Sequence, residues 1–181
     1  MPTEPWEVIS TKRDQSHRLF TLRIDRARSP RSRKEYDFFI LESLPWVNVI
    51  PLTPKNEVVL IRQYRHGIGD VTLEIPGGIV EKNDTPEQAA MRELREETGY
   101  ATSKMVSLGF VHPNPAILNN QCFTFLAKDV RLVDEPHQDE KEDIEVILRP
   151  LSKVSALIRD GSITHALVLA AFYRLFIEHK P

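Results

Sequence analysis

Three glutamates near the middle of the chain have the type and spacing to hold a divalent metal ion. Successive residues of an α-helix lie about 100° apart, so Glu93, Glu96 and Glu97 fall on one arc. Carboxylates this close repel one another, and a hard cation such as Mg²⁺ or Mn²⁺ would remove that cost because it prefers carboxylate oxygens. Arg92 lies one turn before Glu96 and can hold that carboxylate. Taken alone, such a cluster is more often an acidic helix face in solvent.

The helix that must carry these glutamates is predicted from Thr85 to Gly99. Thr85 is a good N-cap, and Pro86 suits the first helical position because no backbone donor is needed there. Gln88 can close a capping box back to Thr85. Gly99 is expected to end the helix, since glycine adopts the left-handed conformation of a C-terminal cap without strain.

The stretch that begins at Gly78 resembles the Nudix box, G-x5-E-x7-R-E-U-x-E-E-x-G-U, in which U is an aliphatic or bulky apolar residue. The matching residues are Gly78, Arg92, Glu93, Leu94, Glu96, Glu97, Gly99 and Tyr100. Asp84 stands where the family has Glu, so that carboxylate is one methylene shorter. The resemblance implies metal-assisted hydrolysis of a nucleoside diphosphate linked to another group, with a water as nucleophile and a carboxylate as general base.

Segments outside the box resemble the ADP-ribose and nucleoside-diphosphate-sugar branch of this family. The run R-Q-Y-R that ends at Arg65 is similar to the R-Q-Y/F-R signature of that branch, and the run L-E-I-P-G-G that contains Glu74 is similar to its L-E-x-P-A-G. The N-terminal part of the chain is similar to a β unit that, in that branch, exchanges between two subunits and helps to bind the base. The resemblance therefore implies a domain-swapped homodimer that binds a small nucleotide-sugar substrate.

The resemblance also implies roles for single residues. The expected ligands of Mg²⁺ or Mn²⁺ are the Gly77 carbonyl and the carboxylates of Glu93, Glu96, Glu97 and Glu142. The expected catalytic residues are Arg92, Glu96, Glu140 and Glu142, with Glu140 as the first choice for the base. The expected substrate-binding residues are Trp6, Tyr36, Arg65, Glu74, Asn119 and Asn120; among them, Arg65 would contact the diphosphate and the two aromatic residues would stack on the base.

Each of these roles has an ordinary structural alternative. Arg65 could form a surface salt bridge, and Glu74 could be an acid at the end of a strand. The acidic segment from Glu140 to Glu145 could be an exposed loop. Asn119 and Asn120 could serve as turn residues rather than as partners of sugar hydroxyls.

Composition narrows the class of protein. The chain has 181 residues, which suits one domain with a small appendage. Its net charge is −2, from 24 basic and 26 acidic residues, so neither nucleic acid nor an anionic membrane is expected as a partner. Cys122 is the single cysteine, which excludes an intramolecular disulfide and a cysteine-based zinc site. No long apolar run and no signal peptide is visible, so the expected location is the cytoplasm.

Apolar and β-branched runs predict strands on both sides of the box helix. The predicted strands are Phe20–Asp25, Tyr36–Leu41, Val47–Leu52, Val58–Tyr64, Thr72–Ile75, Met105–Val111, Cys122–Val130 and Ile144–Leu148. Two more helices are predicted over Ser152–Ile158 and Thr164–Glu178. We expect an α+β protein with a mixed sheet in an α/β/α sandwich, the fold that the Nudix resemblance also implies. A small N-terminal antiparallel β unit is expected over residues 1–45, and the catalytic domain over residues 46–181.

The leading functional prediction is a metal-dependent hydrolase of nucleoside diphosphate sugars of the ADP-ribose or GDP-mannose type. Its products would be a nucleoside monophosphate and a sugar phosphate. Other nucleotides remain as alternatives, namely a dinucleoside polyphosphate, NADH or a nucleoside triphosphate. A non-catalytic, nucleotide-sensing Nudix domain is a further alternative, although the intact acidic residues of the box favour an enzyme.

Overall fold

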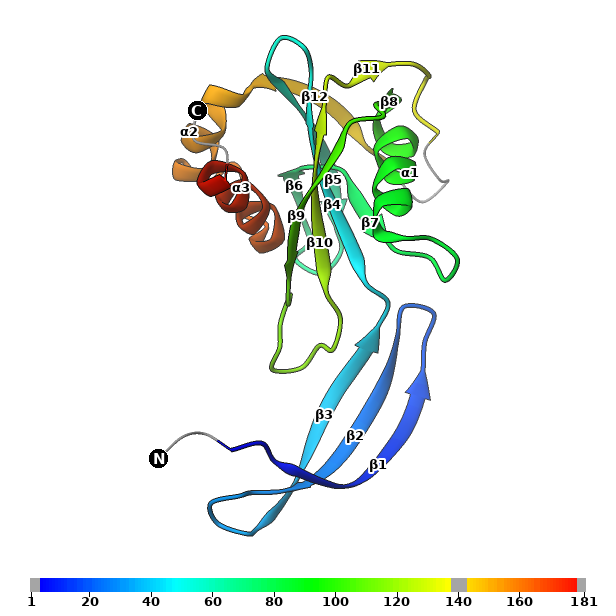
Figure 1. Cartoon of the computed structure of the whole chain (residues 1–181), viewed down its shortest axis with the longest axis vertical. Coiled ribbons are helices and arrows are strands. Elements are labelled where there is room, and N and C mark those ends of the chain that lie inside the picture. Colours follow the sequence, from blue (N-terminus) through cyan, green and yellow to red (C-terminus); the bar gives the residue numbers. More distant parts are fainter. Residues whose placement is uncertain (1–3, 138–142, 179–181) are drawn as a thin grey trace. The chain divides into compact units, whose positions relative to one another are not determined.

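The computed structural model describes residues 4–137 and 143–178 of the chain, which divides into two compact units (Figure 1). The first unit takes Met1–Leu44 together with His112–Gln121, and the second takes Pro45–Val111 and Cys122–Pro181. The loop over His112–Gln121 therefore leaves the second unit between two of its strands and joins the first. Within the described ranges, no helix is long and apolar enough to span a bilayer.

The first unit is built on a small antiparallel sheet, as the sequence predicted. Its strands follow the order β1 (Glu7–Ser16), β2 (Phe20–Arg28) and β3 (Glu35–Ser43). Trp6 and Tyr36 are both exposed. A sheet of this size buries little apolar surface by itself, which accounts for the aromatic side chains left at its surface.

The second unit is built on a mixed seven-stranded sheet. Its main path follows the order β12-β5-β4-β10-β9, while β6 pairs with β5 and β7 pairs with β4. Strands β4 and β10 are parallel, and the other pairs are antiparallel. The strands are β4 (Trp46–Leu52), β5 (Glu57–Arg65), β6 (Asp70–Glu74), β7 (Gly77–Ile79), β9 (Met105–Val111), β10 (Cys122–Lys128) and β12 (Glu145–Pro150).

Helices cover both faces of this sheet (Figure 1). They are α1 (Pro86–Thr98), α2 (Val154–Arg159) and α3 (Ala166–Glu178). Successive residues of a strand point to opposite faces, so Val49 of β4 packs with Leu94 of α1, whereas the next residue, Ile50, packs with Phe172 of α3. The predicted α+β class with α/β/α layers is confirmed.

Several local features differ from the sequence predictions, among them strands β1 and β7, which were not among the predicted strands. Helix α3 begins at Ala166 rather than at Thr164. The second predicted helix opens with a 3-10 turn, η1 (Leu151–Lys153), before α2. The short strands β8 (Tyr100–Ala101) and β11 (Arg131–Leu132) pair with each other and were not predicted, because two residues carry no alternation that a sequence pattern could detect.

The N-terminal cap of α1 has the predicted geometry and gives a test of local stability. The Thr85 hydroxyl accepts the Gln88 N–H at 3.2 Å, and the Gln88 side chain accepts the Thr85 N–H at 2.8 Å. Thr85→Ala should lower the free energy of unfolding by about 1 kcal/mol, measured by urea denaturation. Gln88→Ala removes the other half of the box and should cost less. Equal stability of Thr85→Ala and the wild type would contradict this account.

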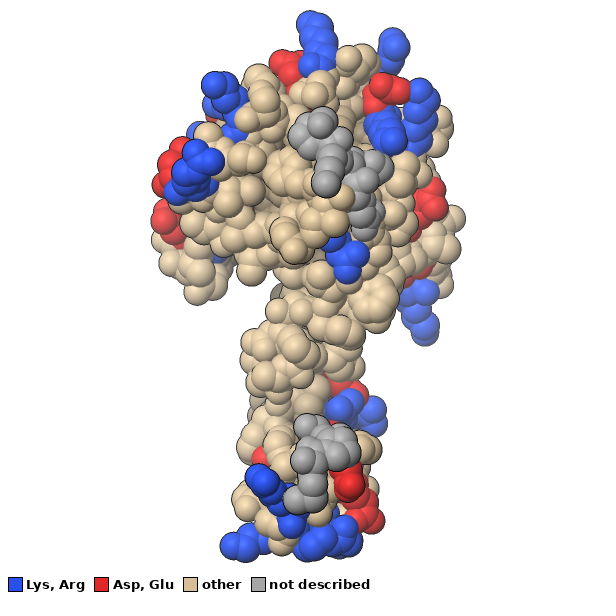
Figure 2. Space-filling model, turned by 60° about the vertical axis from the view of Figure 1, so that its left-hand side comes forward, with Lys and Arg blue, Asp and Glu red and all other residues tan. Residues whose placement is uncertain are grey.

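Basic and acidic side chains are interspersed on the face shown in Figure 2. This agrees with the small net charge of −2 in the sequence. An interspersed surface offers no strong field to a polyanion. That nucleic acid is not a partner nevertheless remains a prediction.

Candidate active site

The predicted metal-binding helix lies directly against strand β7. Glu97 is only 4% exposed, and its Oε2 accepts the backbone N–H of Gly77 at 2.9 Å. Gly78 lies so close to the helix that a Cβ added to it would meet the carboxyl carbon of Glu93 at 2.4 Å. The two glycines thus form a cradle that admits two carboxylates to one short strand, and a larger residue at Gly78 would fill it.

Arg92 holds the acidic side chains around it in place. Its guanidinium donates to Asp84 at 3.2 Å, to Glu93 at 2.8 Å and to Glu96 at 3.1 Å. A further bond runs to the carbonyl oxygen of Ile79 in β7 at 3.1 Å. Burial lowers the pKa of Arg92, but these carboxylates outweigh burial and raise the pKa above its ordinary value. Asp84, which replaces the first Glu of the box, therefore contacts the arginine of the box.

The acidic residues of α1 fit a divalent metal ion by their chemistry. Glu93, Glu96 and Glu97 offer the oxygen donors that hard cations prefer, and two of them converge on the cradle at β7. Over residues 4–137 and 143–178, no three His, Cys, Asp or Glu side chains form a group that could hold a metal. Instead, Arg92 binds two of these carboxylates and the Gly77 amide binds the third.

Two predicted catalytic residues, Glu140 and Glu142, lie outside the described residues. Their roles as base and as metal ligand therefore remain predictions from sequence. The same holds for the carbonyl of Gly77 as a ligand, since the contact shown at this residue is made by its N–H group.

Arg65 and Glu74, both predicted to bind substrate, bind each other. The Nε and Nη2 atoms of Arg65 donate to the two carboxylate oxygens of Glu74, each at 2.8 Å. The Glu74 side chain is 2% exposed and also accepts the hydroxyl of Thr72, whereas the Arg65 side chain is 41% exposed. Burial raises the pKa of Glu74, but the hydrogen bonds from Arg65 and Thr72 outweigh burial and lower it below the ordinary value. Glu74 is thus an ionised anchor for the arginine.

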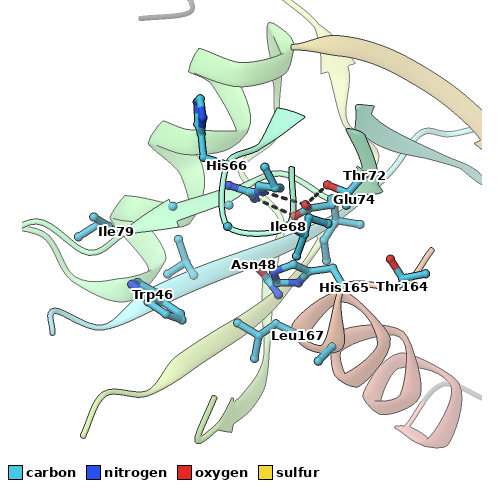
Figure 3. A pocket seen from close by; sticks show the side chains of 17 residues that line it. Trp46, Asn48, His66, Ile68, Thr72, Glu74, Ile79, Thr164, His165 and Leu167 are labelled. Atoms are coloured by element: carbon cyan, nitrogen blue, oxygen red, sulfur yellow. Dashed lines mark hydrogen bonds and ion pairs between the residues drawn. The ribbon is translucent and has the colours of Figure 1, made fainter. Parts of the chain in front are cut away.

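This ion pair borders a pocket of about 660 Å³ in the second unit (Figure 3). Such a volume suits a small-molecule site, for which about 300–1,000 Å³ is usual. Gly77 and Gly78 also line the pocket, so it adjoins the strand against which the carboxylates of α1 lie. Its walls further include Trp46, Asn48, Ile68, His165 and Leu167.

Four predicted substrate residues lie in the first unit. The rings of Trp6 and Tyr36 meet edge to face, with their centroids 6.0 Å apart. Asn119 accepts the N–H of Ser43 at 3.0 Å, and Asn120 donates to the carbonyl of Leu44 at 3.1 Å. The two asparagines thus tie their loop to the end of β3, and their contact with sugar hydroxyls remains a prediction from sequence.

Two pocket residues, Asn48 and His165, received no role from the sequence. Asn48 had a weak signal, because it is the one polar residue of the apolar run from Val47 to Leu52. His165 had no signal, since the sequence placed it inside a predicted helix, and it reaches the pocket through the packing of α3.

Comparison with known proteins agrees with this geometry. The family model of the NUDIX domain matches residues 43–172. A Bacillus subtilis protein named ADP-ribose pyrophosphatase is 30% identical over 121 residues, which are 66% of this chain and 65% of that protein. A Bacillus methanolicus protein named methanol dehydrogenase activator is 28% identical over 95% of this chain and 93% of its own. The crystal structure of an ADP compounds hydrolase aligns with this chain over the full length of both, with a TM-score of 0.85 and 19% identity. At that identity, the likeness shows the fold alone.

The acidic helix α1 lies on the Gly-Gly strand β7, and that strand lines a pocket of small-molecule size. With the family model matching most of its length, the chain belongs to the Nudix family. Nudix hydrolases as a class require a divalent metal ion. The enzyme class expected from the box is therefore confirmed.

The close approach at Gly78 makes a prediction that separates catalysis from folding. Gly78→Ala should push the Glu93 carboxylate aside, and a displacement of about 1 Å can lower kcat/KM about a hundredfold. Gly77→Ala should mainly lower stability, because its Cβ would lie 2.2 Å from the carbonyl oxygen of Val47. Steady-state kinetics and thermal unfolding of both variants test this contrast. Wild-type kcat/KM in Gly78→Ala would show that Glu93 does not depend on the cradle.

Proposed function

We propose that this Nudix hydrolase cleaves the diphosphate of nucleoside diphosphate sugars, with ADP-ribose as the first substrate to test. The products are a nucleoside monophosphate and a sugar phosphate. The observation that carries the proposal is that one pocket is lined both by Arg65, a cation suited to diphosphate, and by strand β7, against which the side chains of Glu93 and Glu97 lie. The ADP-ribose pyrophosphatase named among the relatives supports this substrate class.

The residues of the second unit divide the work of catalysis. Arg65 meets the anionic diphosphate, and Glu74 fixes the plane of its guanidinium through two hydrogen bonds. Glu93 and Glu97 hold Mg²⁺ or Mn²⁺, with Glu96 as a further ligand, and Arg92 orients two of these carboxylates. When bound, such an ion polarises the phosphoryl oxygens and lowers the pKa of water. Glu140 is the proposed base and Glu142 the proposed additional ligand, both from the sequence.

The first unit is proposed to serve base binding and dimerisation. Trp6 and Tyr36 present exposed aromatic rings, and a nucleobase stacks on such rings. A domain-swapped homodimer would cover the apolar surface that the small sheet leaves open. Light scattering coupled to size-exclusion chromatography measures the mass directly, and a monomer at micromolar concentration would contradict the dimer. Cytoplasmic location is likewise retained as a prediction.

A hydrolysis screen tests the proposed function. The enzyme is incubated with Mg²⁺ or Mn²⁺ and with ADP-ribose, GDP-mannose, NADH, diadenosine polyphosphates or nucleoside triphosphates, and the products are separated by chromatography. We expect AMP and ribose 5-phosphate from ADP-ribose. Preferential cleavage of NADH, a dinucleoside polyphosphate or a triphosphate would contradict the proposed substrate class but agree with the proposed type of reaction. Cleavage of none of them would favour the nucleotide-sensing alternative.

A further inference from the structure

Two polar atoms in the pocket are buried without a hydrogen-bond partner among residues 4–137 and 143–178. They are Nδ2 of Asn48 and Nδ1 of His165, and both residues line the pocket. Asn48 is 9% exposed. Buried polar groups in native proteins are nearly always paired, because an unpaired one loses its hydration and gains nothing in return. Two such atoms in one pocket therefore point to a ligand that supplies the missing partners.

These atoms come from elements that are far apart in sequence but belong to the same site. Asn48 stands opposite Gly77 in the pairing of β4 with β7, next to the strand that meets Glu97. His165 directly precedes α3 and lines the same pocket as Glu74. In Figure 3 both side chains lie in the middle of the pocket, whereas His66 points away from it.

Apolar side chains form the walls around this polar pair. Trp46, Ile68 and Leu167 line the pocket together with Asn48 and His165. A site of this kind offers apolar surface to the faces of a ligand and a few fixed polar atoms to its edges. The ligand must therefore carry C–H faces and hydrogen-bonding groups that can both donate and accept.

The position of the pocket limits what that ligand can be. Arg65 and Gly77 line it, so it adjoins the place of the diphosphate in the proposed function. In a nucleoside diphosphate sugar, the group on either side of the diphosphate is a sugar. Sugar hydroxyls both donate and accept hydrogen bonds. They can therefore accept from Nδ2 of Asn48, and they can pair with Nδ1 of His165 whether that nitrogen donates or accepts.

We propose that Asn48 and His165 form a sugar subsite next to the diphosphate and decide which sugar the enzyme accepts. This inference rests on the proposed function, of which it names the sugar-reading residues. The sugar is either the ribose of the nucleoside or the terminal sugar, and both present the same hydroxyl chemistry. The two sources are separated by the two products of ADP-ribose, because AMP carries one sugar and ribose 5-phosphate carries the other.

The test compares variants that keep size but change polarity. Asn48→Leu and His165→Leu should each lower kcat/KM for ADP-ribose roughly tenfold, mainly through KM, as expected for one lost hydrogen bond. His165→Asn keeps a polar atom near the place of Nδ1 and should stay within about threefold of the wild type. Asn48→Leu should also unfold at the same or a higher temperature, since it removes an unpaired buried amide. If Asn48 had only a structural role, its replacement would not raise KM while leaving the unfolding temperature the same or higher.

Product inhibition assigns the sugar, and a matched variant serves as the control. If Asn48→Leu raises the inhibition constant of ribose 5-phosphate alone, the subsite binds the terminal sugar. If it raises the inhibition constant of AMP alone, the subsite binds the ribose of the nucleoside. Gln63→Met removes another buried unpaired amide, one that does not line the pocket, and should leave KM unchanged. Unchanged KM and unchanged inhibition constants in both leucine variants would overturn the subsite and leave the two atoms to ordered water.

Failure of the proposed function is recognisable separately. If the wild type cleaves no nucleoside diphosphate sugar, calorimetric binding of ADP-ribose to the wild type and to Asn48→Leu replaces kinetics. Weaker binding of ADP-ribose by Asn48→Leu than by the wild type would support the sugar subsite even though the proposed reaction does not occur. Absence of binding by the wild type would overturn both proposals.

Discussion

Replacing Glu97 with glutamine should abolish turnover while the fold stays intact. Glu97 is buried, accepts the N–H of Gly77, and is the carboxylate of α1 most deeply placed against β7. Glutamine has the same shape and keeps an oxygen for that hydrogen bond, but it removes the charge that a divalent cation requires. Metal-ion catalysis contributes several kcal/mol, and each 1.4 kcal/mol or so is tenfold in rate. We expect kcat to fall at least roughly a hundredfold.

The measurement is steady-state hydrolysis of ADP-ribose across a titration of Mg²⁺ and Mn²⁺. Glu87→Gln is the matched control, since Glu87 is an exposed residue in the first turn of the same helix and its loss changes net charge equally. The control should keep wild-type kcat and metal affinity. Wild-type turnover of Glu97→Gln at saturating metal would rule out Glu97 as a ligand.

Removing the partner of a buried carboxylate should give the largest loss of stability. Arg65→Ala leaves the Glu74 side chain, which is 2% exposed, with only the Thr72 hydroxyl as its hydrogen-bond partner within the part of the chain that the structure describes. Breaking a fully buried pair costs about 3–5 kcal/mol. Arg65 is partly exposed, so solvent reduces the effect, and we expect a loss of about 2–3 kcal/mol in the free energy of unfolding. Turnover should fall as well, because the diphosphate loses its cation.

A neighbouring residue of the same strand supplies the control for this prediction. Arg62 donates to Glu145 at 2.8 Å, but the Glu145 side chain is 61% exposed. Arg62→Ala should therefore cost less than about 1 kcal/mol, as exposed ion pairs do. Urea denaturation of both variants measures the difference. Equal losses for the two would mean that burial of Glu74 does not determine the effect.

The same pair predicts how stability depends on pH. The pKa of Glu74 is lower in the folded protein than its ordinary value of 4.5, so the folded state favours the ionised carboxylate. Its contribution is full above that ordinary pKa and is lost as the pH falls below 4.5 toward the lowered value. The stability difference between wild type and Arg65→Ala should therefore be greatest at neutral pH and shrink in acid. A difference that stays constant from pH 7 to pH 3 would contradict this linkage.

The sequence alone determined the helix that carries the chemistry. Thr85 and Gly99 mark its ends by capping preferences that act within a few residues, and both caps are present. Alternating and periodic apolar residues likewise predicted the strands and helices, because burial of one face depends on spacing within each element, and the Nudix resemblance implied how these elements are layered. The box motif added the enzyme class.

The tertiary structure alone decided how residues from different elements meet. The pairing of Arg65 with Glu74 and the contact of Asp84 with Arg92 depend on strand register and on the approach of α1 to β7. The meeting of Asn48 with His165 in one pocket depends on where α3 packs. No local pattern encodes such contacts, because their free energy comes from burial and hydrogen bonding between segments that are brought together only when the whole sheet is formed.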